Sequence, residues 1–337
     1  MSVGLDIGSK TIKIVELVKD GDKNRLRASG VIGYSGNPIE HFKTDTEYSS
    51  LANAIKKLHK EAKISSKDVS ISLPESQVFT RSVKFPLLVE SEISSAVKWE
   101  AEQYIPIPID EAIVQHQILE TREDLSPPST IVLLVAAPKN IVSKYSKVIQ
   151  MAGFKLMAVE TELMSMVRAL APKDKTAMIV DLGSRSTDIA LAKYGHLSFS
   201  RSIPTAGEAL TRAIAQSLGV EATQAEQYKK TYGLTQKQLE GKIQAALNPI
   251  LNLVVDEMKK AIQFYKSEEH GEPPQVVLLS GGSSGLPNLT PTLTKMIGIE
   301  VVVGNPFANI VVTPQAAKSL AGFAHLYSPC VGLALRE

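Results

Sequence analysis

Hydrophobic and polar positions follow the same order in two stretches of the chain, residues 3–17 and residues 178–191. Each stretch has a short apolar run, the turn Asp-x-Gly-Ser, and a second run in which apolar and polar residues alternate. An apolar run predicts a buried strand, and alternation predicts a strand with one buried face. Third strands are expected at 26–34 and 197–203, after glycine-containing turns. The sequence therefore predicts two copies of a β-meander, and so a duplicated fold.

A distinct block, about residues 35–118, follows the first meander. It predicts one helix from Asp45 and a second over 91–104, which ends at Ile105-Pro106-Ile107-Pro108 because proline cannot continue a helix. Strands are expected at 69–73, 78–85 and 112–119, and we expect the last of them to return to the first half of the chain.

The remaining segments contain both strand-like and helix-like patterns. Strands are expected at 130–137 and 276–279, and helices at 140–152, 158–171, 207–218, 223–231, 239–265 and 313–324.

Composition narrows the class of protein. The 337 residues suffice for about two domains, and the net charge of +2 argues against a nucleic-acid binder. Lysine pairs such as Lys229-Lys230 are interpreted as solvated helix faces. The single Cys330 cannot form an internal disulfide, which fits a reducing cytoplasm. The apolar run 131–137 is far shorter than the ~20 residues that span a bilayer, so we expect membrane association only through a partner.

The two Asp-x-Gly-Ser turns predict a phosphate clamp. Glycine lets the backbone approach a phosphate, and successive amide groups in such a turn form a concavity that binds anions. Asp6 and Asp181, at the strand ends, are placed to face a divalent cation through water, because Mg²⁺ releases its waters reluctantly. Lys13 and Lys10 follow the first turn and are candidates to direct an ammonium group at the phosphates.

A third glycine-rich segment, residues 278–287, follows a predicted strand. Its pair Gly281-Gly282 is suited to lie flat against a nucleotide base or ribose. The same segment also fits the nucleophile elbow G-x-S-x-G of α/β-hydrolases, with Ser283 as the nucleophile. That alternative requires Glu300 and His325 to complete a triad and leaves the two Asp-x-Gly-Ser turns unexplained.

These motifs, in this order, resemble those of the actin-like ATPase superfamily: phosphate-1 at 6–13, phosphate-2 at 181–188 and the adenosine motif at 278–286. The run 97–106 (VKWEAEQYIP), the helix 257–265 (EMKKAIQFY) and the ending 331–336 (VGLALR) are similar to those of the type IV pilus assembly protein PilM family. The resemblance covers essentially the whole chain.

The resemblance implies an α/β actin-like ATPase fold. It has two lobes with duplicated ribonuclease-H-like subdomains, 1A and 2A, and inserted subdomains 1C and 2B. The implied boundaries are 1–34 for the first part of 1A, 35–118 for 1C, 119–175 for the second part of 1A, 176–215 for the first part of 2A, 216–272 for 2B and a connecting helix, 273–312 for the second part of 2A, and 313–337 for a return to 1A.

The resemblance also implies the ligands and partners, with ATP and Mg²⁺ in the cleft between the lobes. The predicted nucleotide-binding residues are Asp6, Gly8, Ser9, Lys10, Thr11, Lys13, Asp181, Gly183, Ser184, Arg185, Ser186, Thr187, Glu257, Lys260, Gly281, Gly282 and Ser283, with Asp6 and Asp181 facing the metal. The implied partner is the N-terminal cytoplasmic tail of the inner-membrane protein PilN, held in a groove between 1A and 1C. Other inner-membrane pilus components and a homo-oligomer are further possible partners.

Two departures from the superfamily pattern predict slow or absent ATP hydrolysis. Arg185 stands where many relatives have the second glycine of phosphate-2, and Ala206 precedes Gly207 where a Gly-Gly pair is common. No residue is assigned to position the attacking water. Glu160 lies near the expected place, but the predicted helix 158–171 makes an exposed side chain the simpler interpretation. An active ATPase or kinase, for which Asp188 is the nearby catalytic candidate, and an FtsA-like filament protein are the alternatives.

Overall fold

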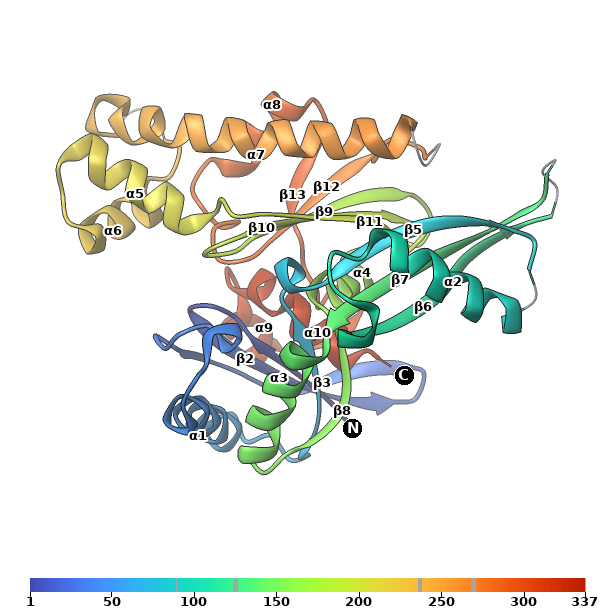
Figure 1. Cartoon of the computed structure of the whole chain (residues 1–337). Coiled ribbons are helices and arrows are strands. Elements are labelled where there is room, and N and C mark those ends of the chain that lie inside the picture. Colours follow the sequence, from blue (N-terminus) through green and yellow to red (C-terminus); the bar gives the residue numbers. More distant parts are fainter. Residues whose placement is uncertain (89, 124–126, 236–237, 268–270, 337) are drawn as a thin grey trace.

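The protein consists of two stacked lobes and an insert that lies against both (Figure 1). The structure, a computed structural model, describes residues 1–88, 90–123, 127–235, 238–267 and 271–336. None of the helices in these ranges is long and apolar enough to cross a membrane.

The first lobe is built on a six-stranded sheet with the order β14-β3-β2-β1-β4-β8. Its strands are β1 (Ser2–Ile7), β2 (Thr11–Asp20), β3 (Lys23–Gly33), β4 (Asp68–Leu73), β8 (Lys155–Thr161) and β14 (Ile310–Val311). Helices α1 (Asp45–Glu61) and α3 (Lys139–Met151) cover one face. The C-terminal elements α9 (Pro314–Leu320), η5 (Ala324–Tyr327) and α10 (Ser328–Ala334) cover the other, where a Cβ on Gly4 would lie 1.9 Å from the Cys330 carbonyl oxygen.

The second lobe has a five-stranded sheet with the order β11-β10-β9-β12-β13. Its strands are β9 (Thr176–Leu182), β10 (Thr187–Lys193), β11 (His196–Ile203), β12 (Val276–Ser280) and β13 (Val301–Val303). Helices α5 (Gly207–Leu218), α6 (Ala222–Tyr232), α7 (Lys242–Ser267) and α8 (Leu289–Ile297), with η4 (Gln238–Gly241) before α7, lie on one side. Helix α4 (Glu162–Leu170) packs on the other side and connects the lobes.

The two sheets repeat one topology, so the predicted duplication is confirmed. In each lobe three antiparallel strands form a meander, and two parallel strands follow on the other side of the first strand. Each Asp-x-Gly-Ser turn joins the first two strands of its meander. Because the topology is shared, the two turns face each other across the space between the lobes.

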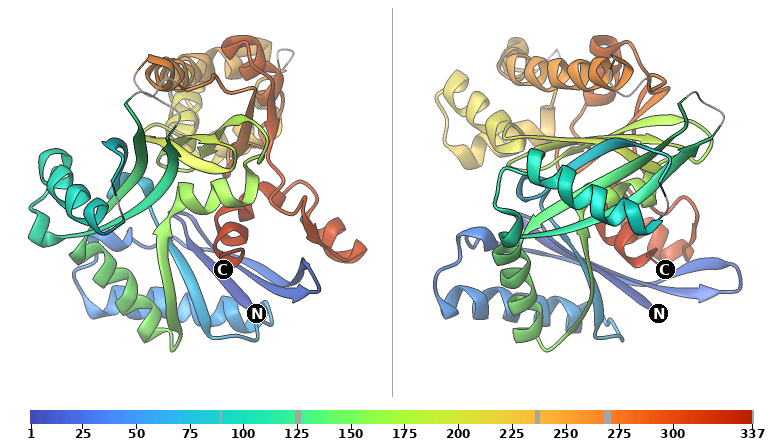
Figure 2. Two further views of the ribbon diagram at one scale, coloured as in Figure 1. Left: turned by 90° about the vertical axis from the view of Figure 1, so that its right-hand side faces the viewer. Right: turned by 45° about the vertical axis from the view of Figure 1, so that its right-hand side comes forward.

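The insert is a three-stranded antiparallel sheet with the order β5-β7-β6. It comprises β5 (Phe79–Pro86), α2 (Glu90–Tyr104), β6 (Ala112–Arg122) and β7 (Ser129–Pro138). Helix α2 covers one face through Ile93, Val97 and Ala101. Leu133 of β7 points the other way, toward α4. Figure 2 shows the insert projecting from the side of the two lobes.

The predicted range of 35–118 for the inserted block is wrong at both ends. Helix α1 and strand β4 belong to the first lobe, since β4 pairs with β1 and β8. Strands β6 and β7 belong to the insert, so β6 does not return to the first lobe. Local patterns identified these strands, but which sheet a strand joins depends on partners far away in the sequence.

Several further elements differ from expectation. Residues 158–161, predicted to begin a helix, complete strand β8, whose pairing with β4 overrides the local helical preference. Strands β13 and β14 and helix α10 were not predicted. Short 3₁₀ helices also appear at η1 (Ile39–His41), η2 (Glu75–Gln77) and η3 (Ile109–Glu111), and η2 links β4 to the insert.

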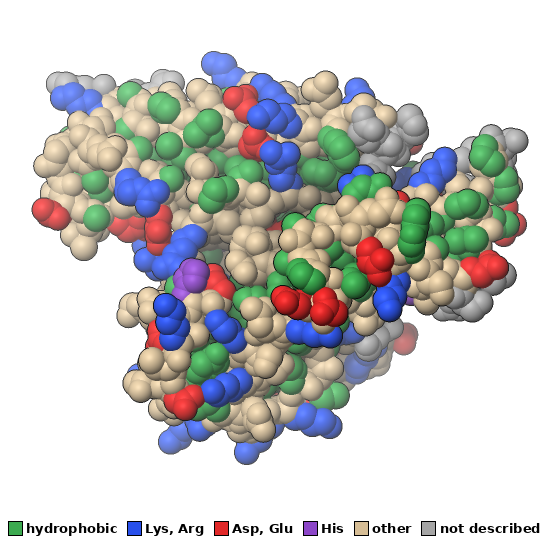
Figure 3. Space-filling view, viewed as in Figure 1, with side chains coloured by type: hydrophobic (Ala, Val, Ile, Leu, Met, Phe, Trp, Pro, Cys, Tyr) green, Lys and Arg blue, Asp and Glu red, His purple; other side chains and the backbone are tan. Residues whose placement is uncertain are grey.

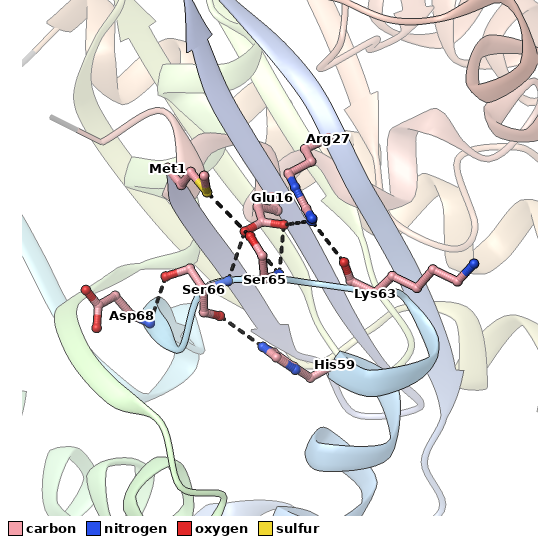
Figure 4. Close-up of polar contacts among 8 residues, drawn as sticks. All are labelled: Met1, Glu16, Arg27, His59, Lys63, Ser65, Ser66 and Asp68. Atoms are coloured by element: carbon pink, nitrogen blue, oxygen red, sulfur yellow. Dashed lines mark hydrogen bonds and ion pairs between the residues drawn. The ribbon is translucent and has the colours of Figure 1, made fainter.

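A buried carboxylate fastens the α1–β4 loop to the first sheet (Figure 4). Glu16 of β2 is fully buried, and its carboxylate accepts hydrogen bonds from the backbone N–H groups of Ser65 and Ser66 at 3.0 Å. The Ser65 hydroxyl and the Arg27 guanidinium also donate to it. Burial raises the pKa of Glu16, but the hydrogen bonds from Ser65, Ser66 and Arg27 outweigh it, so the pKa lies below its ordinary value.

We expect Glu16→Gln to lower the free energy of unfolding at pH 7 by about 1–3 kcal/mol, because an amide N–H₂ would face N–H donors and Arg27 would lose its charge partner. Since the folded-state pKa is depressed, this stabilisation is complete above the ordinary pKa of 4.5 and is lost as the pH falls through the folded-state value. Urea unfolding at pH 7 and pH 3 measures the difference. Glu61→Gln, on the exposed end of α1, is the control. An equal loss at both pH values would contradict the prediction.

Candidate functional site

The two Asp-x-Gly-Ser turns have the same internal geometry. The Gly8 N–H donates to the Thr11 carbonyl at 3.0 Å, and the Gly183 N–H donates to the Ser186 carbonyl at 3.1 Å. A Cβ on Gly8 would lie 3.1 Å from that acceptor oxygen, and one on Gly183 would lie 2.9 Å from its own. The tight turn itself therefore requires glycine, in addition to any requirement from a phosphate.

A buried ion pair lies beneath the first turn. Asp6 and Lys13 are direct partners in the β1–β2 ladder, and the Lys13 ammonium lies 2.7 Å from the Asp6 carboxylate. Burial lowers the pKa of Lys13, but the nearby Asp6, with Cys330 and Asp181, raises it more, so Lys13 keeps its charge. Lys13 thus occupies the predicted place near the turn, with Asp6 as its first partner.

The second turn departs from the first at one position. In the β9–β10 ladder Asp181 pairs with Asp188, so Asp188 takes the place that Lys13 has in the first lobe. Asp188 is buried; one of its oxygens accepts from the Ser186 hydroxyl at 2.9 Å, and the other has no partner. Burial, together with Asp188, raises the pKa of Asp181 to about 7. The two lobes therefore present three carboxyl groups and one ammonium group to each other.

Two glutamates that the sequence analysis did not identify, Glu75 and Glu162, add to these three carboxyl groups. Glu75, in η2, is buried with one oxygen unpartnered, and burial raises its pKa to about 7. Glu162 begins α4, and burial together with Asp6, Asp188, Asp181 and Glu75 raises its pKa well above the ordinary value. We define the carboxyl cluster as Asp6, Glu75, Glu162, Asp181 and Asp188. Only the three-dimensional fold brings these residues together, because η2 and α4 lie far from both turns in sequence.

A cavity of about 690 Å³ opens between the first lobe, the insert and the second lobe. Both turns, two members of the carboxyl cluster (Glu75 and Glu162), and segments on either side of the insert contribute to its wall. The lining includes Gly8, Ser9, Pro38, Ile39, Glu75, Val78, Phe79, Thr80, Tyr145, Glu162, Arg185, Ser186 and Arg201. The space-filling view shows the surface hollowed between the lobes (Figure 3).

The glycine-rich segment after β12 lies beside the second turn. Gly281 has a φ of +84°, and a Cβ there would lie 2.4 Å from the Asp181 carboxylate, so only glycine fits. The Ser283 N–H donates to the Leu182 carbonyl at 3.0 Å. A Cβ on Gly207 would lie 2.7 Å from the Ser283 hydroxyl, which places the first residue of α5 in the same group. The 281–283 segment therefore lies directly beside the second turn.

One lysine interpreted from sequence as a surface residue is buried beside this segment. The Lys229 ammonium, on α6, donates to the Gly207 carbonyl at 2.9 Å and pairs with Glu226 at 2.6 Å, whereas Lys230 is exposed. Burial lowers the pKa of Lys229, and Glu226 opposes that shift. The i,i+3 spacing of Glu226 and Lys229, on a helix that follows the second meander, was the available sequence signal.

Glu257 and Lys260 lie on α7, away from the glycine-rich segment after β12. Glu257 pairs with Arg201 of β11 at 2.6 Å and with Lys260 at 2.8 Å. Strand β11 is three positions from β12 in the sheet, which is about 14 Å at the usual strand spacing. The structure therefore does not group these two side chains with Gly281 and Ser283.

The other predicted residues lie at the turns. The Thr187 hydroxyl is buried and donates to the Thr205 carbonyl at 2.6 Å, while Thr11 begins β2. Lys10, Ser184 and Arg185 all contact Glu208, in the first turn of α5.

The α/β-hydrolase alternative lacks its geometry. The His325 ring lies beside Gly285, 3.4 Å from the place of a Cβ on that glycine, but Glu300 precedes β13 at the opposite end of the parallel strands from Ser283. Glu160, in contrast to the expected exposed position, is buried on β8 and pairs with Arg168 and Arg336. These two ion pairs indicate that Glu160 has a structural role.

The model of the family described as type IV pilus assembly protein PilM matches residues 4–337. The chain belongs to this family. A solved PilM–PilN type IV pilus biogenesis complex has a chain that superposes with a TM-score of 0.84 at 26% identity, covering 99% of this chain and 98% of that one. The predicted actin-like fold is confirmed.

More distant relatives share the architecture of the PilM family. The cell division protein FtsA of Bacillus subtilis is 23% identical over 247 residues, which are 61% of this chain and 54% of the relative. MreB5 of Spiroplasma citri, solved with AMPPNP, superposes with a TM-score of 0.53 at 12% identity, covering 95% of this chain and 93% of that one. At these identities the likeness shows the fold alone.

The raised pKa values of Glu75 and Asp181 predict an unusual pH dependence of the protein's stability. A folded state that holds protons on Glu75 and Asp181 up to about pH 7 loses stability as the pH rises from about 5 to 7, because the unfolded chain releases these protons at lower pH. We expect Glu75→Gln to weaken this dependence and to raise the melting temperature at pH 7.5 by roughly 2–5 °C, since the amide resembles the protonated acid. Differential scanning calorimetry from pH 5 to pH 8 without nucleotide, with Glu61→Gln as the control, measures it. A wild-type protein whose stability rises over this interval would refute the assignment.

Proposed function

We propose that this PilM-family protein binds ATP and Mg²⁺ between its lobes and holds the N-terminal cytoplasmic tail of PilN between the first lobe and the insert. It would act as a scaffold that responds to nucleotide. The proposal rests on one observation: a cavity of about 690 Å³ has both phosphate-binding turns and the base of the insert in its wall.

The two turns fit a polyphosphate chain held from both sides. Their backbone N–H groups and the hydroxyls of Ser9 and Ser184 supply donors, and Lys10 and Arg185 supply positive charge at the opening. Gly207 and Gly281, which have no side chains, lie beside the second turn, and the Lys229 ammonium donates to the Gly207 carbonyl. The backbone that the two glycines leave uncovered suits the nucleoside. Glu257 and Lys260 would contribute only if α7 moved toward the segment after β12.

The carboxyl cluster fits a hydrated Mg²⁺ ion. Buried carboxylate oxygens of Glu75 and Asp188 lack partners, and a buried anion without a partner is costly. Among the described residues no three carboxylate, histidine or cysteine side chains are placed to ligate a metal directly. Asp6 and Asp181 would therefore reach the ion through its waters. When bound, the ion would neutralise charge on the phosphates.

The proposed tail groove lies where the first lobe meets the insert. Ile39 of η1, Tyr145 of α3 and Val78 line it on the side of the first lobe, and Phe79 and Thr80 of β5 line it on the side of the insert. The solved complex contains PilM together with PilN, which supports a tail of that kind as the occupant. Because the groove and the phosphate-binding turns line one cavity, a bound nucleotide would change the surface that the tail contacts.

Slow hydrolysis is the expected kinetic behaviour. Glu162 lines the cavity and is the carboxyl group that would orient a water, but burial and the neighbouring carboxyl groups raise its pKa. A raised pKa favours the protonated form, which is a poor base. Binding to PilN would place the protein in the cytoplasm at the inner membrane, where other inner-membrane pilus components and a second copy of the chain are further proposed partners.

We expect isothermal titration calorimetry to show ATP binding that requires Mg²⁺. Asp6→Ala should weaken ATP binding at least about tenfold. Without Asp6, the Lys13 ammonium loses the partner that holds it in place, so it is less precisely positioned to neutralise a phosphate. Asp181→Asn should fold normally, since burial raises the pKa of Asp181 to about 7 and the amide resembles the protonated acid, but it should lose the Mg²⁺ dependence. The steady-state rate of phosphate release should stay well below ~1 s⁻¹, the lower end of typical kcat values. No detectable ATP binding by the wild type would overturn the nucleotide proposal, and rapid turnover would favour the ATPase alternative.

A fluorescent peptide of the PilN cytoplasmic N-terminus should bind in an anisotropy titration, more tightly with ATP than without. Phe79→Ala, which shortens the insert wall of the groove, should weaken peptide binding about tenfold and leave ATP affinity unchanged. Ile113→Ala, at an exposed position on β6, is the matched control. A peptide that fails to bind with ATP present would count against the PilN assignment.

A further inference from the structure

One carboxylate, that of Glu208, receives positively charged and hydrogen-bonding groups from both phosphate-binding turns. The Lys10 ammonium of the first turn lies 2.9 Å from Glu208 Oε1. The Ser184 hydroxyl of the second turn donates to the same oxygen at 3.3 Å, and the Arg185 guanidinium lies 3.7 Å from it. Three groups expected to bind phosphate therefore converge on one internal anion.

The position of Glu208 is fixed by the way α5 begins. The N–H groups of Gly207 and Glu208 donate to the carbonyls of Gly183 and Ser184 at 3.1 and 2.8 Å, so the first turn of α5 is fastened to the second phosphate-binding turn. The backbone of Glu208 cannot move away from this turn without breaking these bonds. Its side chain is about one-third exposed (34%), so it can rotate into solvent without moving the backbone.

A carboxylate and a phosphate compete for the same kind of donor. Both accept charge-assisted hydrogen bonds from ammonium, guanidinium and hydroxyl groups. Burial raises the pKa of Glu208, but Lys10, Arg185 and Ser184 lower it more, so its pKa lies below the ordinary value and the side chain is ionised at neutral pH. Its negative charge would repel a phosphate that approached the same donors.

We propose that Glu208 is a built-in competitor for the phosphate chain of the nucleotide. In the ligand-free protein its carboxylate occupies the anion position between the turns and links the lobes through Lys10. A bound polyphosphate takes over Lys10, Ser184 and Arg185, and the Glu208 side chain turns out to solvent. Glu208 thereby lowers nucleotide affinity. This inference rests on the proposed binding of ATP between the two turns.

Calorimetric titration of Glu208→Gln with ATP and Mg²⁺ tests the proposal. Glutamine keeps the size of the side chain but not its charge, so we expect ATP to bind about two- to fivefold more tightly than to the wild type, the range of an exposed ion pair. The gain should shrink at 0.5 M NaCl, where salt screens the charges. It should be absent for AMP, which lacks the phosphates that reach both turns.

Glu300→Gln is the matched control, because it makes the same charge change in the same lobe. Glu300 is exposed and precedes β13, at the opposite end of the parallel strands from the second turn. It should leave ATP affinity unchanged. Thermal melts should show that both variants fold. Glu208→Asp, which keeps the charge but is one methylene too short for the Lys10 contact, gives a second variant that should also bind ATP more tightly.

The outcomes separate the two claims. If the wild type binds no ATP, the proposed function fails and this inference falls with it. If the wild type binds ATP but Glu208→Gln binds it equally or more weakly, or gains as much affinity for AMP, the competitor role is refuted while the proposed function stands.

Discussion

The buried ion pair between Lys13 and Asp6 is the interaction on which the centre of this protein depends. A charge removed from water is costly unless it is paired, and Lys13 is the ammonium group that faces the carboxyl cluster. The ladder partners of β1 and β2 hold the pair together, and α10 closes over it so tightly that Gly4 tolerates no Cβ. The first Asp-x-Gly-Ser turn is therefore built directly on a packed, charged core.

Duplication explains the architecture, and divergence explains the chemistry. Both lobes repeat a meander followed by parallel strands, which makes the two turns face each other. At the equivalent ladder position the first lobe has Lys13 and the second has Asp188. This exchange leaves an excess of carboxyl groups between the lobes, and burial there raises the pKa values of Asp181 and Asp188.

The insert extends this arrangement to a second surface. Glu75 lies in the short segment that leads from the first sheet into the insert, and its side chain reaches the carboxyl cluster. The carboxyl cluster and the start of the insert are therefore adjacent, and Glu75 belongs to both.

The sequence alone determined the two meanders, their glycine turns and the family, because alternation, turn glycines and motif order are local properties. It misplaced the limits of the insert and read residues 158–161 as helix, because the choice of sheet partner is made by β1, β4 and β8 together. The residues of the candidate site that lie outside the motifs could be identified only from the tertiary structure. It buried Lys229, raised the pKa values of Glu75 and Glu162, and placed Glu208 among the phosphate donors. Burial and the approach of groups distant in sequence set charge and protonation, and neither is encoded in a local pattern.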